Sequence, residues 1–310
     1  MDRTIKFSEL QNAVNEAYEK FKDFDKGEVD PRVKDADASK FGISVTLTDG
    51  RTIKVGDTDT QAPLGGIAKV PTAELLLSQL KDPDEIVEKA RGGKCCCAGK
   101  KPEKPHIPVS PRGVRAMSAI QPTGDADGKW DMVVNNLINL SESEPTLDDS
   151  LYKQLTEQNH QANAVNALAE ADFFLYDDAA ISIDLYTRLK SMKMSASQLS
   201  ALSATIAADG FNPITKQIVF DGSISQRVVA MMAVKGPHHM SLPWLIKSGL
   251  PAQTSFAGTI MGVLPGVMGI AAYSPKVNPA GISARGAHAL AYIMNKLGLS
   301  ALSSARVSVE

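Results

Sequence analysis

The chain has 310 residues, of which 43% are hydrophobic and 22% are charged, and its formal net charge is −2. This length suffices for one large core or for two lobes in one chain. A charge this close to zero argues against nucleic acid and anionic membranes as partners. No stretch approaches the roughly 20 apolar residues that span a bilayer, and the first residues lack a signal-peptide pattern, so we expect a cytoplasmic protein without a membrane segment.

The N-terminal part of the sequence predicts a helix followed by a β-hairpin. Residues 7–24 carry apolar side chains at helical spacing. Two alternating runs at 43–47 and 51–55 flank the Asp49-Gly50 pair, and both residues of this pair tolerate positive φ, which is typical of a tight hairpin turn. A further helix is expected at 66–80.

An irregular segment at 90–111 follows. It combines paired glycines, paired lysines and four prolines with three adjacent cysteines, Cys95, Cys96 and Cys97. Prolines at this density disfavour both helix and central strand, so the segment is predicted to be an exposed loop. Three adjacent cysteines form neither a disulfide framework nor the spaced pattern of a zinc site. We therefore expect no metal and no cofactor.

Helices dominate from residue 129 onward, and two strands precede a closing helix. The expected helices cover 129–140, 147–171, 180–193, 196–208, 223–234 and 281–297, and the expected strands cover 255–263 and 267–273. Ser195 and Gln198 form a capping box at the start of one helix.

The order of these elements predicts the fold class. The late strands must bury their faces against the early hairpin, which gives an α/β (α+β) fold with an antiparallel sheet flanked by helices and an all-helical lobe. We assign residues 1–64 and 245–310 to an α/β lobe and 65–244 to a mainly helical lobe of a single domain. A ligand cleft is expected between the lobes.

Several short sequence motifs occur in a fixed order along the chain. They include Lys40-Phe41-Gly42-Ile43, Asp184-Leu185-Tyr186-Thr187-Arg188, Asn212-Pro213-Ile214-Thr215, Gly249-Leu250-Pro251-Ala252 and Pro265-Gly266-Val267-Met268-Gly269-Ile270. Their order and spacing resemble the serine-dependent, β-lactamase-like glutaminases of bacterial type over nearly the whole chain. The resemblance implies a penicillin-binding-protein/serine β-lactamase-like fold.

The resemblance also implies a chemistry, which the sequence does not preserve. Members of that family hydrolyse L-glutamine to glutamate and ammonia through a Ser-x-x-Lys motif, in which the lysine takes the serine proton. Here the matching stretch reads Gly65-Gly66-Ile67-Ala68-Lys69, so Lys69 matches the base and Gly66 falls at the nucleophile position. Because glycine has no side chain, we expect a divergent member without the family's acyl-enzyme.

The resemblance assigns further positions to the cleft, and all but one of them have changed. They are Arg115, Leu155, Ala162, Tyr186, His238, Ser255 and Phe256. Of these, Tyr186 alone matches a substrate-contacting residue of the family. Leu155 and Ala162 stand where the family has a carboxylate and an amide, and leaving substrate polar groups unpaired costs about 1–3 kcal/mol each.

Two hypotheses about function follow from these changes. The first is a degenerate glutaminase, a pseudoenzyme that acts as a binding, scaffold or assembly protein. The alternative is a repurposed small-molecule enzyme or a cleft for an amino-acid derivative, with a thiolate from Cys95–Cys97 as nucleophile. An active glutaminase ranks below both. The resemblance also implies a homo-oligomer, either a dimer or a tetramer, and leaves room for a protein partner or an amino-acid-like ligand.

Each candidate residue also has an ordinary structural explanation. Lys69 can extend its ammonium to solvent, and Tyr186 can fill space by packing. His238 follows a Gly-Pro pair and fits a turn better than a ligand site. The cysteines fit a mobile loop, and S-acylation of that loop is a weaker alternative.

Overall fold

The computed structural model describes residues 3–80, 110–159, 161–170 and 173–310. Cys95, Cys96 and Cys97, and the predicted loop at 90–111 up to residue 109, lie outside the described residues. The chain divides into two compact units. The sheet unit comprises Met1–Ile67, Leu137–Thr146 and Lys193–Glu310, and the helical unit comprises Ala68–Asn136 and Leu147–Met192.

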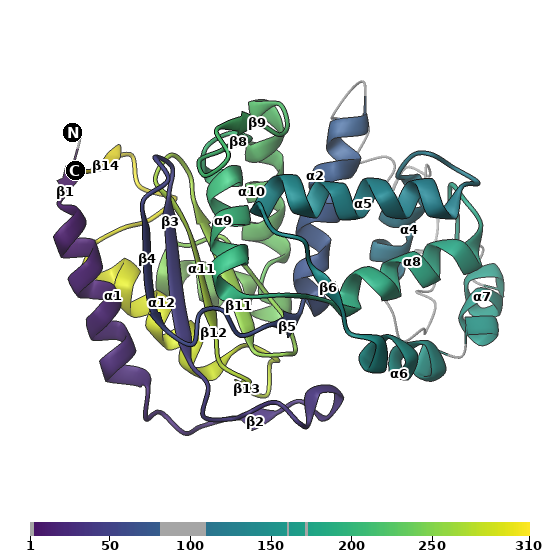
Figure 1. Ribbon diagram of the computed structural model, residues 1–310, viewed down its shortest axis with the longest axis horizontal. Helices are drawn as coiled ribbons and strands as arrows, with labels where there is room; N and C mark the ends of the chain where they lie inside the picture. Colours follow the sequence, from purple (N-terminus) through teal and green to yellow (C-terminus); the bar gives the residue numbers. More distant parts are fainter. Residues whose placement is uncertain (1–2, 81–109, 160, 171–172) are drawn as a thin grey trace. The chain divides into compact units, whose positions relative to one another are not determined.

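The sheet unit is built around five antiparallel strands (Figure 1). Their order is β10 (Ala252–Thr254), β11 (Thr259–Leu264), β12 (Met268–Tyr273), β3 (Gly42–Leu47) and β4 (Thr52–Gly56). Ile270 pairs with Val45 and Val45 with Ile53, so the late strands join the early hairpin as predicted. The mixed α/β fold class is confirmed.

Helices cover both faces of this sheet. Figure 1 shows α1 (Phe7–Phe21) and α12 (Ala284–Lys296) on one side and α9 (Ala196–Ala207) on the other. Gly269 of β12 allows the close approach of α9, because a Cβ there would overlap the backbone of Ala204. The capping box of Ser195 and Gln198 starts α9 as the sequence predicts.

Shorter elements complete the sheet unit. They are β1 (Arg3–Ile5) with β14 (Val307–Val309), β2 (Glu28–Val29) with β13 (Lys276–Val277), η1 (Pro31–Val33), β5 (Ala62–Pro63), η2 (Gly65–Ala68), β8 (Phe211–Asn212) with β9 (Gln217–Ile218), α10 (Gly222–Lys235), η3 (His238–Met240) and α11 (Ser241–Ser248). Strands β6 (Thr146–Leu147) and β7 (Met192–Met194) lie where the chain passes from one unit to the other.

The helical unit contains six described helices. They are α2 (Lys69–Gln79), α4 (Pro111–Ala119), most of α5 (Ala126–Ser141), α6 (Asp149–Asn159), α7 (Gln161–Glu170) and α8 (Ala179–Ser191). A buried ion pair joins Lys129, whose side chain is 0% exposed, to Asp177 at 2.5 Å. Buried Glu74 accepts a hydrogen bond from Asn136 at 2.6 Å.

The structure adds helices α4 and α11, which the sequence did not predict, and it differs from the predicted elements at three further places. The helix expected at 147–171 is two helices, α6 and α7. The strand expected from residue 255 begins only at Thr259, because the Ser255 side chain and Gly258, with φ +89°, form a turn. The predicted lobe boundary placed 193–244 with the helical lobe, whereas α9 packs on the sheet and takes this segment into the sheet unit.

Candidate functional site

The segment matching the family motif lies at the junction of η2 and α2. Gly66 is the second residue of η2, and Lys69 is the first residue of α2, which follows η2 directly along the chain. Thr72 fixes the first turn of α2 by donating its hydroxyl proton to the Ala68 carbonyl at 2.7 Å. The sequence separation of positions 66 and 69 is the one that a Ser-x-x-Lys motif has.

Lys69 is the ionisable group of this segment. Its side chain is partly buried, and desolvation lowers its pKa from the ordinary 10.5. Within the described residues it has neither a hydrogen-bond partner nor an ion-pair partner. A lysine with these properties is more readily deprotonated than one at the surface, so its amine can act as a base.

Gly65, one residue before Gly66, is held against the loop that follows β10. Its φ is +50°, and a Cβ at this position would lie 2.6 Å from the Ser255 hydroxyl and 2.8 Å from the Phe256 ring. Both features require glycine. Gly65 therefore shares a tightly packed region of the sheet unit with Ser255 and Phe256.

Ser255 is a structural residue rather than a nucleophile. Its hydroxyl donates to the Pro63 carbonyl at 2.6 Å and accepts from the Ala257 N–H at 3.1 Å, and its side chain is fully buried. The proton that a nucleophilic serine would give to a base is already held by a carbonyl. Ser255 therefore links the loop after β10 to β5.

Phe256 is 8% exposed and supports a cation that the sequence reasoning did not identify. The Arg32 guanidinium lies 3.8 Å from the centre of the Phe256 ring, and Asp30 holds the same guanidinium through hydrogen bonds of 2.8 and 2.7 Å. A cation over a ring face is favourable by about 0.5–1 kcal/mol or more. The short Asp30-Pro31-Arg32 segment carried no sequence signal that would have predicted this contact.

In the helical unit, Tyr186 of α8 is 1% exposed, and burial raises its pKa. Its ring packs directly against Gly113 of α4, where any Cβ would overlap the ring carbons and the hydroxyl. Gly113 is the second residue that sequence reasoning missed, since an isolated glycine near a helix start is not distinctive. The packing interpretation of Tyr186 accounts for this contact.

The remaining predicted positions lie as follows. Arg115 of α4 donates from Nε to the Phe174 carbonyl at 2.9 Å, and its guanidinium lies 3.7 Å from the centre of the Phe173 ring. Leu155 of α6 is buried. Ala162 is in α7 and His238 begins η3, but their side chains lie outside the described structure.

The described side chains and helices also bear on metal binding and membrane insertion. No group of three or more His, Cys, Asp or Glu side chains there is arranged to hold a metal ion. None of the helices described is both long and apolar enough to cross a bilayer.

The comparisons identify the family. A family model described as Glutaminase matches residues 27–302. A protein named Glutaminase from Bacteroides fragilis is 37% identical over 100% of this chain and 99% of its own length. Another from Bacteroides thetaiotaomicron is 38% identical over 98% of both chains. A solved structure called probable glutaminase ybaS has a TM-score of 0.84 and 26% identity, covering 97% of this chain and all of that one.

The fold defined by the sheet and helical units is therefore the β-lactamase-like fold of the glutaminase structures. The chain belongs to the glutaminase family.

These matches contradict one sequence-based hypothesis. The prediction of a pseudoenzyme acting as a scaffold or assembly protein is wrong, because relatives of 35–38% identity over the full length are named Glutaminase. The alternative of a repurposed cysteine enzyme gains no support from them. The prediction gave too much weight to changes at single cleft positions and too little to the similarity of the whole chain.

Proposed function

We propose that this chain hydrolyses the side-chain amide of L-glutamine to glutamate and ammonia. The observation that carries the proposal is the full-length similarity to curated proteins named Glutaminase. The partly buried Lys69 also supports the proposal, because an amine with a lowered pKa can act as a base.

We further propose that the chain is a divergent member that does not use a serine at residue 66. Gly66 offers no hydroxyl, and the Ser255 hydroxyl is committed to the Pro63 carbonyl. The nucleophile must then be water, and the neutral amine of Lys69 is the base that activates it.

The proposed step balances as follows. Lys69 Nζ takes one proton from water while the water oxygen forms a bond to the amide carbon. The carbon–nitrogen bond then breaks, and the departing nitrogen takes that proton back from Lys69 and leaves as ammonia. Water and the amide become a carboxylic acid and ammonia, and Lys69 returns to its neutral form.

The test is ammonia release from L-glutamine by the wild type and by Lys69→Met. The control is Lys34→Met, which removes the same charge from an exposed lysine. We expect Lys69→Met to lose activity by about 100-fold or more, in the range of general-base catalysis, and Lys34→Met to keep it. A folded wild type that releases no ammonia would refute glutamine hydrolysis, whereas equal rates for wild type and Lys69→Met would refute only the role of Lys69.

We also propose that the chain forms a homo-oligomer, a dimer or a tetramer. Helix α11 supports this, because Leu242 and Ile246, four residues apart on one helix face, are 66% and 77% exposed. Exposed large apolar side chains on one face are typical of interfaces. Sedimentation of the wild type and of a Leu242→Glu/Ile246→Glu variant tests it, and a monomeric wild type would contradict it. The cytoplasmic localisation stays a prediction.

A further inference from the structure

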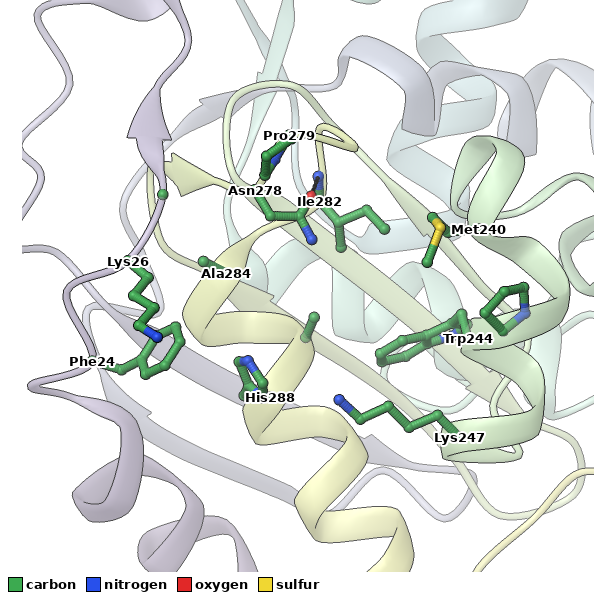
Figure 2. Close-up of a pocket in the computed structure, with 13 residues that line it drawn as sticks. Phe24, Lys26, Met240, Trp244, Lys247, Asn278, Pro279, Ile282, Ala284 and His288 are labelled. Atoms are coloured by element: carbon green, nitrogen blue, oxygen red, sulfur yellow. Dashed lines mark hydrogen bonds between the residues drawn. The ribbon is translucent and has the colours of Figure 1, made fainter.

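The sheet unit contains a hollow whose residues have no part in the proposed chemistry. Its volume is about 370 Å³, and it lies between the chain after α1, helix α11 and the start of α12. Phe24, Met240, Trp244 and Ile282 provide apolar walls (Figure 2). Hollows of about 300–1,000 Å³ with mostly apolar walls are the usual size for small-molecule sites.

Asn278 presents a hydrogen-bond donor to this hollow. Asn278 uses its side-chain oxygen to accept from the N–H groups of Ala280 and Ile282, at 2.9 and 3.1 Å. Figure 2 shows its amide nitrogen pointing into the hollow. Within the described residues this nitrogen has no hydrogen-bond acceptor.

Positive charge is concentrated at one end of the same hollow. His288 lies there with Lys26 and Lys247 nearby (Figure 2). Burial, Lys247 and Lys26 together lower the pKa of His288, so the two ammonium groups act on the imidazole as positive neighbours. No described carboxylate lies within 4.0 Å of either ammonium. Bringing an anion here would relieve repulsion that the protein itself leaves uncompensated.

We propose that this hollow binds a small carboxylate with a hydrocarbon body, at a site separate from the amide chemistry. The carboxylate lies toward Lys247 and Lys26, and the hydrocarbon lies against Trp244 and Met240. Apolar walls with two cations at one end exclude a cationic ligand and leave a bare phosphate without apolar contacts.

The experiment uses hexanoate as the probe and the fluorescence of Trp244 as the signal. The chain has two tryptophans, and Trp130→Phe leaves Trp244 as the only one. We expect hexanoate to change this fluorescence saturably and L-glutamine not to displace it. Hexylamine should not bind, and hexanol and inorganic phosphate should bind at least about tenfold more weakly, since each lacks one part of the recognition.

Charge variants complete the test. Lys247→Met and Lys26→Met should each weaken hexanoate binding by about fivefold, the scale of a partly exposed ion pair, and Lys34→Met should not. The proposal is overturned if hexanoate does not saturate the signal or if hexanol or phosphate binds as tightly. It is equally overturned if Lys34→Met weakens binding as much as Lys247→Met. None of these outcomes depends on glutamine hydrolysis.

Discussion

Gly113 contacts the predicted site residue Tyr186. The substitution Gly113→Ala, which adds one methyl group, therefore tests the packing around Tyr186. Gly113 lies inside α4, where alanine is ordinarily better than glycine by about 1 kcal/mol. A Cβ there would meet three atoms of the Tyr186 side chain at less than 3.0 Å, a separation that real Cβ atoms essentially never show. Tyr186 is fully buried and cannot swing into solvent to make room.

The two effects have opposite signs, and their sizes decide the outcome. Overpacking of a buried site costs about 1–3 kcal/mol, and a rigid ring that cannot retreat places this case at the upper end. After the gain in helix propensity is subtracted, Gly113→Ala should destabilise the helical unit by about 1–2 kcal/mol. Gly128→Ala is the comparison variant in the same unit: its Cβ would displace the side chain of Asp125, which accepts from the Gly128 N–H at 2.9 Å, so loss of this hydrogen bond offsets the gain in helix propensity. We expect this comparison variant to be close to neutral.

The free energy of unfolding of the helical unit is measured by urea unfolding, followed by Trp130 fluorescence in a Trp244→Phe background. Trp130 reports on this unit because it belongs to it. In a Tyr186→Leu background the cost of Gly113→Ala should shrink or reverse, since the smaller side chain removes the overlap. A free energy of unfolding lowered no more by Gly113→Ala than by Gly128→Ala would refute the packing argument.

Three further substitutions have defined expectations. Lys129→Met should cost about 3 kcal/mol in a urea titration, the lower end for a broken buried pair, because Asp177 loses its cation but keeps the N–H groups of Gly124 and Asp178, and a cost below about 1 kcal/mol would contradict this. Burial raises the pKa of Glu74 above 4.5, so stability from this group is lost as pH rises through its folded-state pKa. Glu74→Gln should flatten that dependence in thermal melts at a series of pH values, and an unchanged profile would argue against it. Gly65→Ala should lower the melting temperature by forcing a Cβ against Ser255 at positive φ, at a cost of about 1–3 kcal/mol, and an unchanged melting temperature would count against that strain.

Much of the fold could be predicted because its signals are local. The Asp49-Gly50 turn, the capping box at Ser195 and the alternation of the strands all depend on neighbouring residues. The joining of β12 to β3 follows from the need to bury apolar faces. By contrast, the turn at Ser255 depends on a hydrogen bond to Pro63, 192 positions away in the sequence, and no local pattern reports such a contact.

The candidate site was predicted less completely. Short sequence motifs identified Gly66, Lys69 and Tyr186 as site positions, because these residues lie within segments that resemble the family. They gave no indication of Arg32 over Phe256 or of Gly113 under Tyr186, since both contacts join residues far apart in the chain. They also led to the wrong functional class, because single substitutions were read without the similarity of the full-length relatives.

The most direct test of glutamine hydrolysis is the pH dependence of ammonia release from L-glutamine by the purified wild-type chain, measured beside Lys69→Met. The base must be neutral to accept a proton, so activity should rise with pH through the pKa of Lys69, which desolvation holds below 10.5. The account predicts a wild-type rate that rises in this way and is lost in Lys69→Met. Absence of ammonia release by folded wild type at every pH would contradict the proposal that the chain hydrolyses glutamine.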